Sequence, residues 1–240
     1  MIGPGFLSPA LVPRLRHQAV GATQRLLGET IVLPDAEWQS PSLLPGWTKA
    51  HVATHLAWHA LGLAAVADRI YQGQPQPAWS VSDQTVDIEA GSQRDALDLQ
   101  VDLDTTAGRL SRVLEAFEPE HWTATLTTPL GPLPAIALSM ARLNEVVLHH
   151  VDLACGLTMA EIDLEVAQWL LSWNALRLQP RFVSFRLRLL SDEGFDETLG
   201  SGPRLVEVRG STTGLLGWLT GRLDGSAVLG ADSVQLGPAV

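Results

Sequence analysis

Hydrophobic residues recur at helical spacing along most of the first two thirds of the chain. The first such segment covers 8–30, where Ser8 can cap the helix and the proline after it suits the first turn. A proline-rich loop over 34–46 follows. Thr48 then caps a second helix, which continues to about Arg69. The pattern therefore predicts two long helices joined by an irregular connection.

Two further helices are predicted before the pattern changes. The stretch 72–91 has no clear hydrophobic period, which indicates a long loop. A third helix is expected over 92–117, and Pro119 closes it. Threonine-rich alternation over 122–134 predicts a short hairpin. The fourth helix, over 134–155, carries hydrophobic residues on nearly every side, which is typical of a buried helix.

The last third of the chain has a different character. Thr158 and Glu161 form a capping box that opens a helix to about residue 178. Alternating hydrophobic and polar residues over 182–190 predict a half-buried strand. The remaining elements expected are strands over 205–209 and 227–229 and a helix over 211–222. The fold class is therefore α+β, with a helical domain over 1–156 and a small α+β domain over 157–240.

Composition excludes several classes of protein. The chain has 240 residues, a net charge of −10 and 46% hydrophobic residues, which favours a packed core. An acidic surface disfavours nucleic acid and anionic membranes as partners. No hydrophobic stretch is long enough for a transmembrane helix, and the N-terminus lacks the basic region of a secretory signal. The single cysteine, Cys155, excludes an internal disulfide and fits a reducing compartment, so we expect a cytoplasmic protein.

A polar stripe interrupts the fourth predicted helix. Arg142, Glu145, His149 and Asp152 follow one another at steps of three, four and three, so they share one face. A carboxylate in a buried helix is costly unless it has a partner. Glu145 is therefore expected either to bind a cation together with His149 or to pair with Arg142. Asp152 is either a group that orients a ligand histidine or a charge near the helix end.

The second predicted helix carries a similar anomaly. His51, His55 and His59 are spaced four apart among hydrophobic residues. Imidazole nitrogens and carboxylate oxygens suit zinc and related divalent ions. Glu145 and His149 can reach one ion from one helix, and a histidine of a facing helix would complete three ligands and leave positions open for catalysis. The alternative is a metal-free core in which the histidines bond to the backbone.

Two motifs resemble a known family. The sequences LPGWTKAHVATHLA over 44–57 and EVVLHHVDL over 145–153 are similar to those of the mycothiol-dependent maleylpyruvate isomerase family. That family belongs to the DinB-like metal-binding helical bundles. The resemblance extends over nearly the whole chain, because 210–222 is similar to a motif of the family's C-terminal domain. It implies a DinB-like four-helix bundle that holds a divalent metal, usually zinc, followed by a small C-terminal α/β domain.

The resemblance also implies roles for individual residues. The metal ligands would be His55, Glu145 and His149. His55 is preferred to His51 because it follows the motif tryptophan by eight residues. Arg222 would face the site from the C-terminal domain, where its guanidinium suits a substrate carboxylate. The alternative for Arg222 is a solvated charge at a helix end.

The implied chemistry uses a low-molecular-weight thiol, mycothiol or an analogue, and a small electrophilic substrate. A metal-bound thiol loses its proton readily. The thiolate adds to a conjugated double bond, the bond rotates, and the thiol leaves. The same site could transfer the thiol and stop there, so isomerase and S-transferase remain alternatives.

Two positions depart from the family pattern. Gln84 stands where the family has an arginine, and His59 stands where a polar residue other than histidine is common. Both put maleylpyruvate in doubt as the substrate.

Cys155 lies near a helix C-terminus, which does not activate a thiol, so we interpret it as a packing residue. The alternative to an enzyme is a non-catalytic metal-binding protein with a stress-related or regulatory role.

Overall fold

The computed structural model describes residues 4–74, 84–234 and 236. The chain clusters into two compact units, Leu7–Leu157 and Thr158–Val240, with Met1–Phe6 grouped with the second. Within the described ranges, no helix has the length and hydrophobicity needed to cross a membrane.

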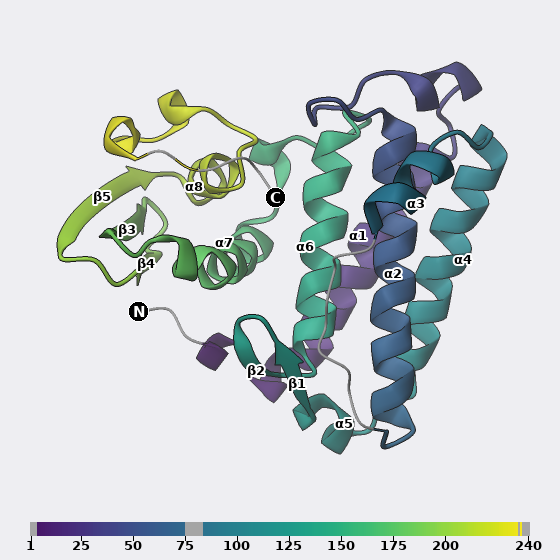
Figure 1. Ribbon diagram of the computed structural model, residues 1–240, viewed down its shortest axis with the longest axis horizontal. Coiled ribbons are helices and arrows are strands. Elements are labelled where there is room, and N and C mark those ends of the chain that lie inside the picture. Colours follow the sequence, from purple (N-terminus) through teal and green to yellow (C-terminus); the bar gives the residue numbers. More distant parts are fainter. Residues whose placement is uncertain (1–3, 75–83, 235, 237–240) are drawn as a thin grey trace. The chain divides into compact units, whose positions relative to one another are not determined.

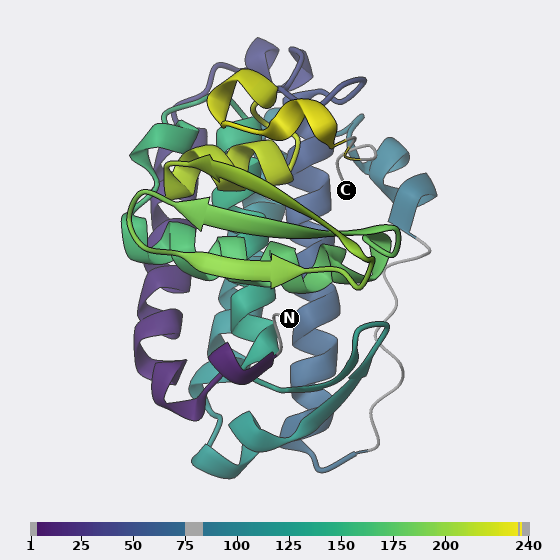
Figure 2. The same cartoon turned by 90° about the vertical axis from the view of Figure 1, so that its left-hand side faces the viewer.

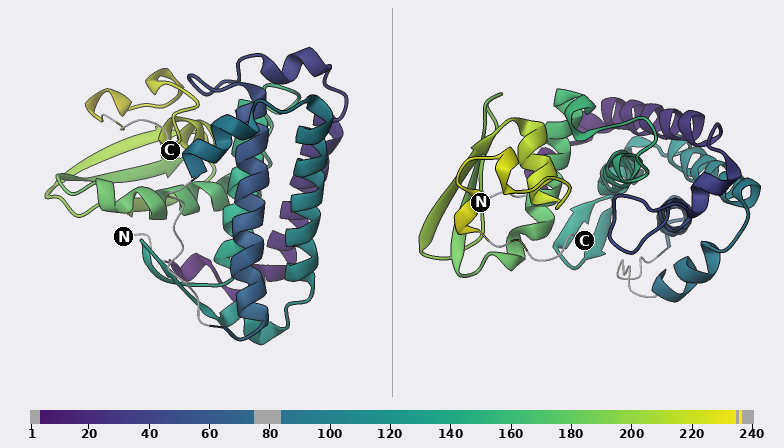
Figure 3. Two further views of the ribbon diagram at one scale, coloured as in Figure 1. Left: turned by 45° about the vertical axis from the view of Figure 1, so that its right-hand side comes forward. Right: turned by 90° about the horizontal axis from the view of Figure 1, so that it is seen from above.

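The first unit is a bundle of four long helices. These are α1 (Val12–Thr30), α2 (Lys49–Tyr71), α4 (Ala96–Glu115) and α6 (Ala137–Asp152). They run side by side, with α2 packed against α4 and α6, and α1 packed against α6 (Figures 1 and 3). The short helix η2 (Pro9–Leu11) precedes α1, and the connections between the long helices include η3 (Asp35–Gln39), α3 (Gln84–Gly91) and α5 (Pro119–Thr123). The expected four-helix bundle is thus confirmed.

The connection between α2 and α4 differs from the expectation. The stretch expected to be a loop includes α3, and α4 begins later than predicted. Asp95 is the N-cap of α4, because its Oδ1 accepts a hydrogen bond from Asp98 N at 2.9 Å. Ser92, the expected start, instead donates its hydroxyl to Glu89 O at 2.8 Å and so closes α3. The predicted hairpin is present as β1 (Thr125–Thr128) and β2 (Gly131–Pro134).

The cap assignment gives a stability prediction. Asp95→Ala removes an N-cap acceptor of α4 and should lower the free energy of unfolding by about 1 kcal/mol. The matched control, Asp104→Ala, removes an exposed carboxylate from the middle of the same helix and should change it by less than about 0.5 kcal/mol. Urea unfolding of both variants measures the difference. Equal effects of the two substitutions would contradict the assignment.

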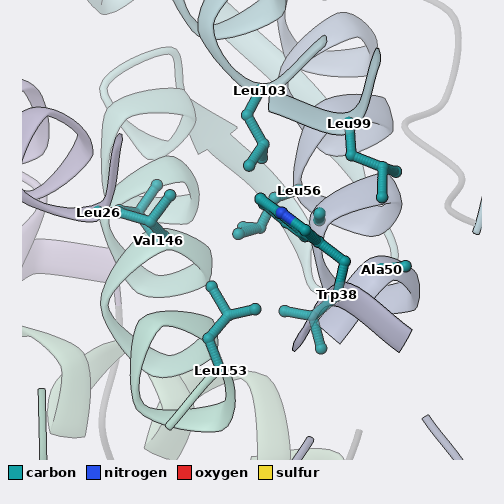
Figure 4. Packing of buried hydrophobic residues seen from close by; sticks show 10 residues of the cluster. Leu26, Trp38, Ala50, Leu56, Leu99, Leu103, Val146 and Leu153 are labelled. Atoms are coloured by element: carbon teal, nitrogen blue, oxygen red, sulfur yellow. The ribbon is translucent and has the colours of Figure 1, made fainter. Parts of the chain in front are cut away.

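The bundle core gathers around Trp38 of η3. Its side chain lies among Leu56 of α2, Leu99 of α4 and Leu153 in the turn after α6 (Figure 4), and it is 2% exposed. Trp58 of α2, whose helical spacing predicts a position in the bundle core, is 38% exposed. That expectation is wrong, because a residue of the bundle core would be almost fully buried, as Trp38 is.

The second unit combines two helices and a three-stranded sheet. The strand order is β4 (Asp196–Leu199), β3 (Phe185–Ser191), β5 (Arg204–Gly210). The β3–β4 pair is antiparallel and the β3–β5 pair is parallel. Helices α7 (Leu164–Leu178) and α8 (Thr212–Leu219) pack on one face of the sheet (Figure 2). These elements confirm the α+β class.

Local details of this unit correct three expectations. The Thr158–Glu161 capping box exists, but it opens the short η4 (Met159–Glu161), and Asp163 caps α7. Strand β4 was not expected. The expected strand over 227–229 reduces to one bridge between Arg209 and Leu229. The remaining short helices are η1 (Pro4–Phe6), η5 (Gln179–Arg181), η6 (Gly225–Ala227) and η7 (Ala231–Ser233).

Candidate metal centre

Helices α2 and α6 bring three potential ligands together. His55 Nε2 lies 3.0 Å from Glu145 Oε2, and His149 Nε2 lies 3.1 Å from the same oxygen. One ligand atom from each of the three residues lies within 4.8 Å of the other two. The side chains are 15%, 14% and 13% exposed for His55, Glu145 and His149, so all three are largely buried. The structure therefore gathers the three residues that the resemblance implied as ligands.

Glu145 is a charged carboxylate inside the bundle. Burial alone would raise the pKa of Glu145, but hydrogen bonds from His149 and His55 outweigh it and hold the pKa well below its usual range. Arg142 was the alternative partner. Its Nη1 donates a hydrogen bond to Leu56 O at 2.9 Å. The positive charge of Arg142 also attracts the Glu145 carboxylate. The carboxylate is therefore held chiefly by imidazoles, a side-chain type that commonly binds metals in proteins.

Asp152 orients one of these imidazoles. His149 Nδ1 donates to Asp152 Oδ2 at 2.7 Å, and the Asp152 side chain is fully buried. Burial tends to lower the pKa of His149, but the contacts with Asp152 and Glu145 raise it above the ordinary value. With Nδ1 engaged, Nε2 faces Glu145. A carboxylate behind the far nitrogen is the usual support of a metal-binding histidine, so the donor set and its surroundings fit a divalent ion.

This support gives a second prediction. Asp152→Asn keeps the size of the side chain but weakens the orientation of His149, so divalent metal affinity should fall about tenfold to a hundredfold. Isothermal titration with zinc measures the change. Asp104→Asn, an exposed change on α4, should leave the affinity unaltered. If Asp152→Asn binds zinc with wild-type affinity, metal binding by His149 does not depend on its contact with Asp152.

The other two histidines of α2 have different surroundings. His51 Nδ1 accepts a hydrogen bond from the N–H of Thr48 in the cap of α2, and its Nε2 lies 3.1 Å from Glu89 Oε2. His59 is buried, and burial lowers its pKa to about 3, so its imidazole is neutral. Neither belongs to the ligand cluster. The centre of the Trp47 ring lies 5.7 Å from that of His55, so this tryptophan is a neighbour of the cluster.

The remaining candidate residues lie elsewhere in the chain. Arg222 follows α8 in the second unit, where its Nη1 donates to Thr220 O at 3.1 Å, and its approach to the metal centre stays a prediction. Gln84 begins α3, but its side chain lies outside the described part of the structure. Burial and the nearby charge of Glu29 raise the pKa of the Cys155 thiol to about 11. A protonated thiol agrees with the interpretation that Cys155 is no nucleophile.

Three comparisons place the chain among known proteins. Two uncharacterized proteins, from two strains of Mycobacterium tuberculosis, are each 30% identical over 193 residues, which cover 78% of this chain and 69% of the relative. Crystal structures of mycothiol-dependent maleylpyruvate isomerase, one of them of a mutant, superpose with a TM-score of 0.82 at 22% identity and cover 95% of both chains. These structures share the fold. The model of the mycothiol maleylpyruvate isomerase N-terminal domain matches residues 19–154. Because that match spans more than half of the sequence, this chain belongs to the mycothiol maleylpyruvate isomerase family.

Proposed function

We propose that this protein is a metal- and thiol-dependent enzyme, an isomerase or an S-transferase, whose divalent ion is held by His55, Glu145 and His149. The observation that carries the proposal is the convergence of two imidazole nitrogens and one carboxylate oxygen within 4.8 Å. This donor set suits zinc, and three protein ligands leave a position open for a further ligand. Family membership supports the same conclusion.

The chain's own residues prepare this centre. Asp152 holds Nδ1 of His149, which leaves Nε2 available to an ion. His59 stays neutral beside the site, so it adds no positive charge that would repel a cation. When bound, a divalent ion lowers the pKa of a coordinated thiol and supplies a nucleophilic sulfur near neutral pH.

Family membership supports the choice of thiol and guides the choice of electrophile. The crystal structures with this fold are of an enzyme described as mycothiol-dependent and acting on maleylpyruvate. We infer that mycothiol or an analogue is the thiol here, in a cytoplasmic protein, and that the substrate is a small carboxylate-bearing electrophile. Arg222 is the residue we assign to its carboxylate. Gln84, in place of an arginine, favours weak or absent maleylpyruvate turnover and transfer of the thiol to another electrophile.

An assay with defined metal and thiol tests this function. The zinc-loaded and metal-free protein should be compared with mycothiol, bacillithiol and glutathione on maleylpyruvate and on a general thiol acceptor. We expect one thiol to give activity that metal removal abolishes and zinc restores. Thiol consumed with the acceptor indicates transfer, whereas product formed without thiol loss indicates isomerisation. Efficient maleylpyruvate turnover would show that Gln84 is no handicap.

One outcome favours the alternative class. If the zinc-loaded protein is inactive with every thiol, the chain is a non-catalytic metal-binding member of the family. Metal content must be measured in the same sample, because protein without bound metal would also be inactive.

A further inference from the structure

A second group of metal-ligating side chains lies where α1 and α6 end. Glu29 is in the last turn of α1, His150 is in the last turn of α6, and Cys155 follows α6 by three residues. One ligand atom from each lies within 4.8 Å of the other two. His150 Nε2 is 3.1 Å from Glu29 Oε2. All three residues belong to the helical unit, so the group is formed within one compact body.

This group is separate from the centre described above. His149 and His150 are consecutive on α6, and consecutive residues of a helix point about 100° apart. His149 therefore faces His55 on α2, whereas His150 faces Glu29 on α1. The two clusters share no residue. One helix thus presents an imidazole to each of two neighbouring helices.

The local backbone is arranged to admit the Glu29 carboxylate. Arg25 binds Glu29 Oε1 at 2.9 Å and Gly156 O at 2.8 Å, which leaves Oε2 directed at His150. A Cβ atom at Gly156 would lie 1.5 Å from Oε2. Gly156 also has φ of +132°, a conformation that other residues rarely adopt. The carboxylate therefore occupies space that only a glycine leaves open.

We propose that Glu29, His150 and Cys155 form a second binding site for a divalent ion of the zinc class. Thiolate, imidazole and carboxylate are the three ligand types that zinc takes in proteins. Ligand atoms about 2.0–2.3 Å from a tetrahedral ion stand roughly 3.3–3.6 Å from one another. The three ligand atoms lie within 4.8 Å of one another, so movements on the order of 1 Å bring them to that geometry.

Charges of both signs lie near this group, because Arg25 and Lys49 act on it as well as Glu29. The carbonyl ends of α1 and α6 both lie at this place, and helix C-termini carry partial negative charge. Burial and Glu29 keep the Cys155 thiol protonated in the absence of an ion, with a pKa of about 11. The ion would replace that proton: a sulfur–metal bond forms, the S–H bond breaks, and the proton passes to solvent. Arg25 remains on Oε1 and limits the net charge of the site.

Cobalt(II) distinguishes this site from the first one. Only the second site contains a thiol, and Cys155 is the only cysteine of the chain. Titration of the metal-free full-length protein with Co²⁺ should therefore produce the near-ultraviolet thiolate-to-cobalt charge-transfer band. His149→Ala, which disables the first centre, should retain the band. Cys155→Ser should abolish it and reduce bound zinc from two ions per chain to one.

Alkylation gives an independent readout. Zinc should slow the reaction of Cys155 with iodoacetamide by roughly tenfold or more in the wild type, and His150→Gln should remove most of this protection. Far-ultraviolet circular dichroism checks that the variants are folded. Absence of the charge-transfer band at saturating Co²⁺ overturns the proposal, as does zinc protection that persists in His150→Gln. Neither readout requires the enzyme to be active. A negative result would therefore contradict the second metal site without contradicting the proposed function.

Discussion

Replacing His149 by alanine should abolish divalent metal binding at the proposed active centre. The substitution removes one of three ligand atoms and leaves Glu145 with a single imidazole contact from His55. Loss of a supporting contact alone costs about tenfold to a hundredfold in affinity, so loss of a ligand should cost more than about a hundredfold. Calorimetric titration with zinc in the Cys155→Ser background measures this site without a contribution from the second one.

His51→Ala is the matched control for that experiment. His51 lies on the same helix, one turn before His55, but its ring is engaged by the cap of α2 and by Glu89. We therefore expect its loss to leave zinc affinity within about threefold of the wild type. The free energy of unfolding should fall by about 1 kcal/mol, as it does when a helix cap is removed. If His51→Ala removes the metal and His55→Ala does not, the ligand assignment is wrong.

The hydrophobic pattern was sufficient to predict the bundle. Three of the four long helices have hydrophobic residues at helical spacing and the fourth is hydrophobic on nearly every side, while Thr48 is a recognisable cap, so local sequence indicates where the helices lie. The α+β character of the last third followed from the change to alternation after residue 180. Short elements were harder to predict. Strand β4 has four residues, and α3 lies in a stretch without a clear period, so neither carries enough pattern to be recognised.

The two clusters of potential metal ligands differ in how far sequence could find them. Glu145 and His149 are four residues apart on one helix, and the histidines of α2 repeat every four residues, so spacing alone suggested a shared ion. Glu29 is far from Cys155 in the chain, and only the packing of α1 against α6 brings them together. No motif in the sequence marks that pairing. The role of Asp152 was one of two alternatives until its contact with His149 at 2.7 Å was known.

Arg222→Ala should strongly reduce turnover of anionic substrates and leave the fold and metal content unchanged. The expectation follows from the role we assign to Arg222, a bidentate contact with a substrate carboxylate in a partly desolvated site. One charged contact made in the transition state is worth roughly 3 kcal/mol, so kcat/KM should fall about a hundredfold. Arg222→Lys should recover only part of this, because an ammonium cannot form the two parallel hydrogen bonds.

A second arginine of the same unit provides the control. Arg209 is on β5, where its Nη2 lies 3.2 Å from Glu207 Oε2 and its side chain is 59% exposed. Arg209→Ala removes an equal charge, so it should leave kcat/KM within about twofold if Arg222 acts through direct contact rather than through net charge. The difference between Arg222→Ala and Arg209→Ala should disappear with an uncharged electrophile, because that substrate offers no carboxylate. Equal losses on charged and uncharged substrates would instead show that Arg222 supports the structure of the turn after α8, where it donates to Thr220 O.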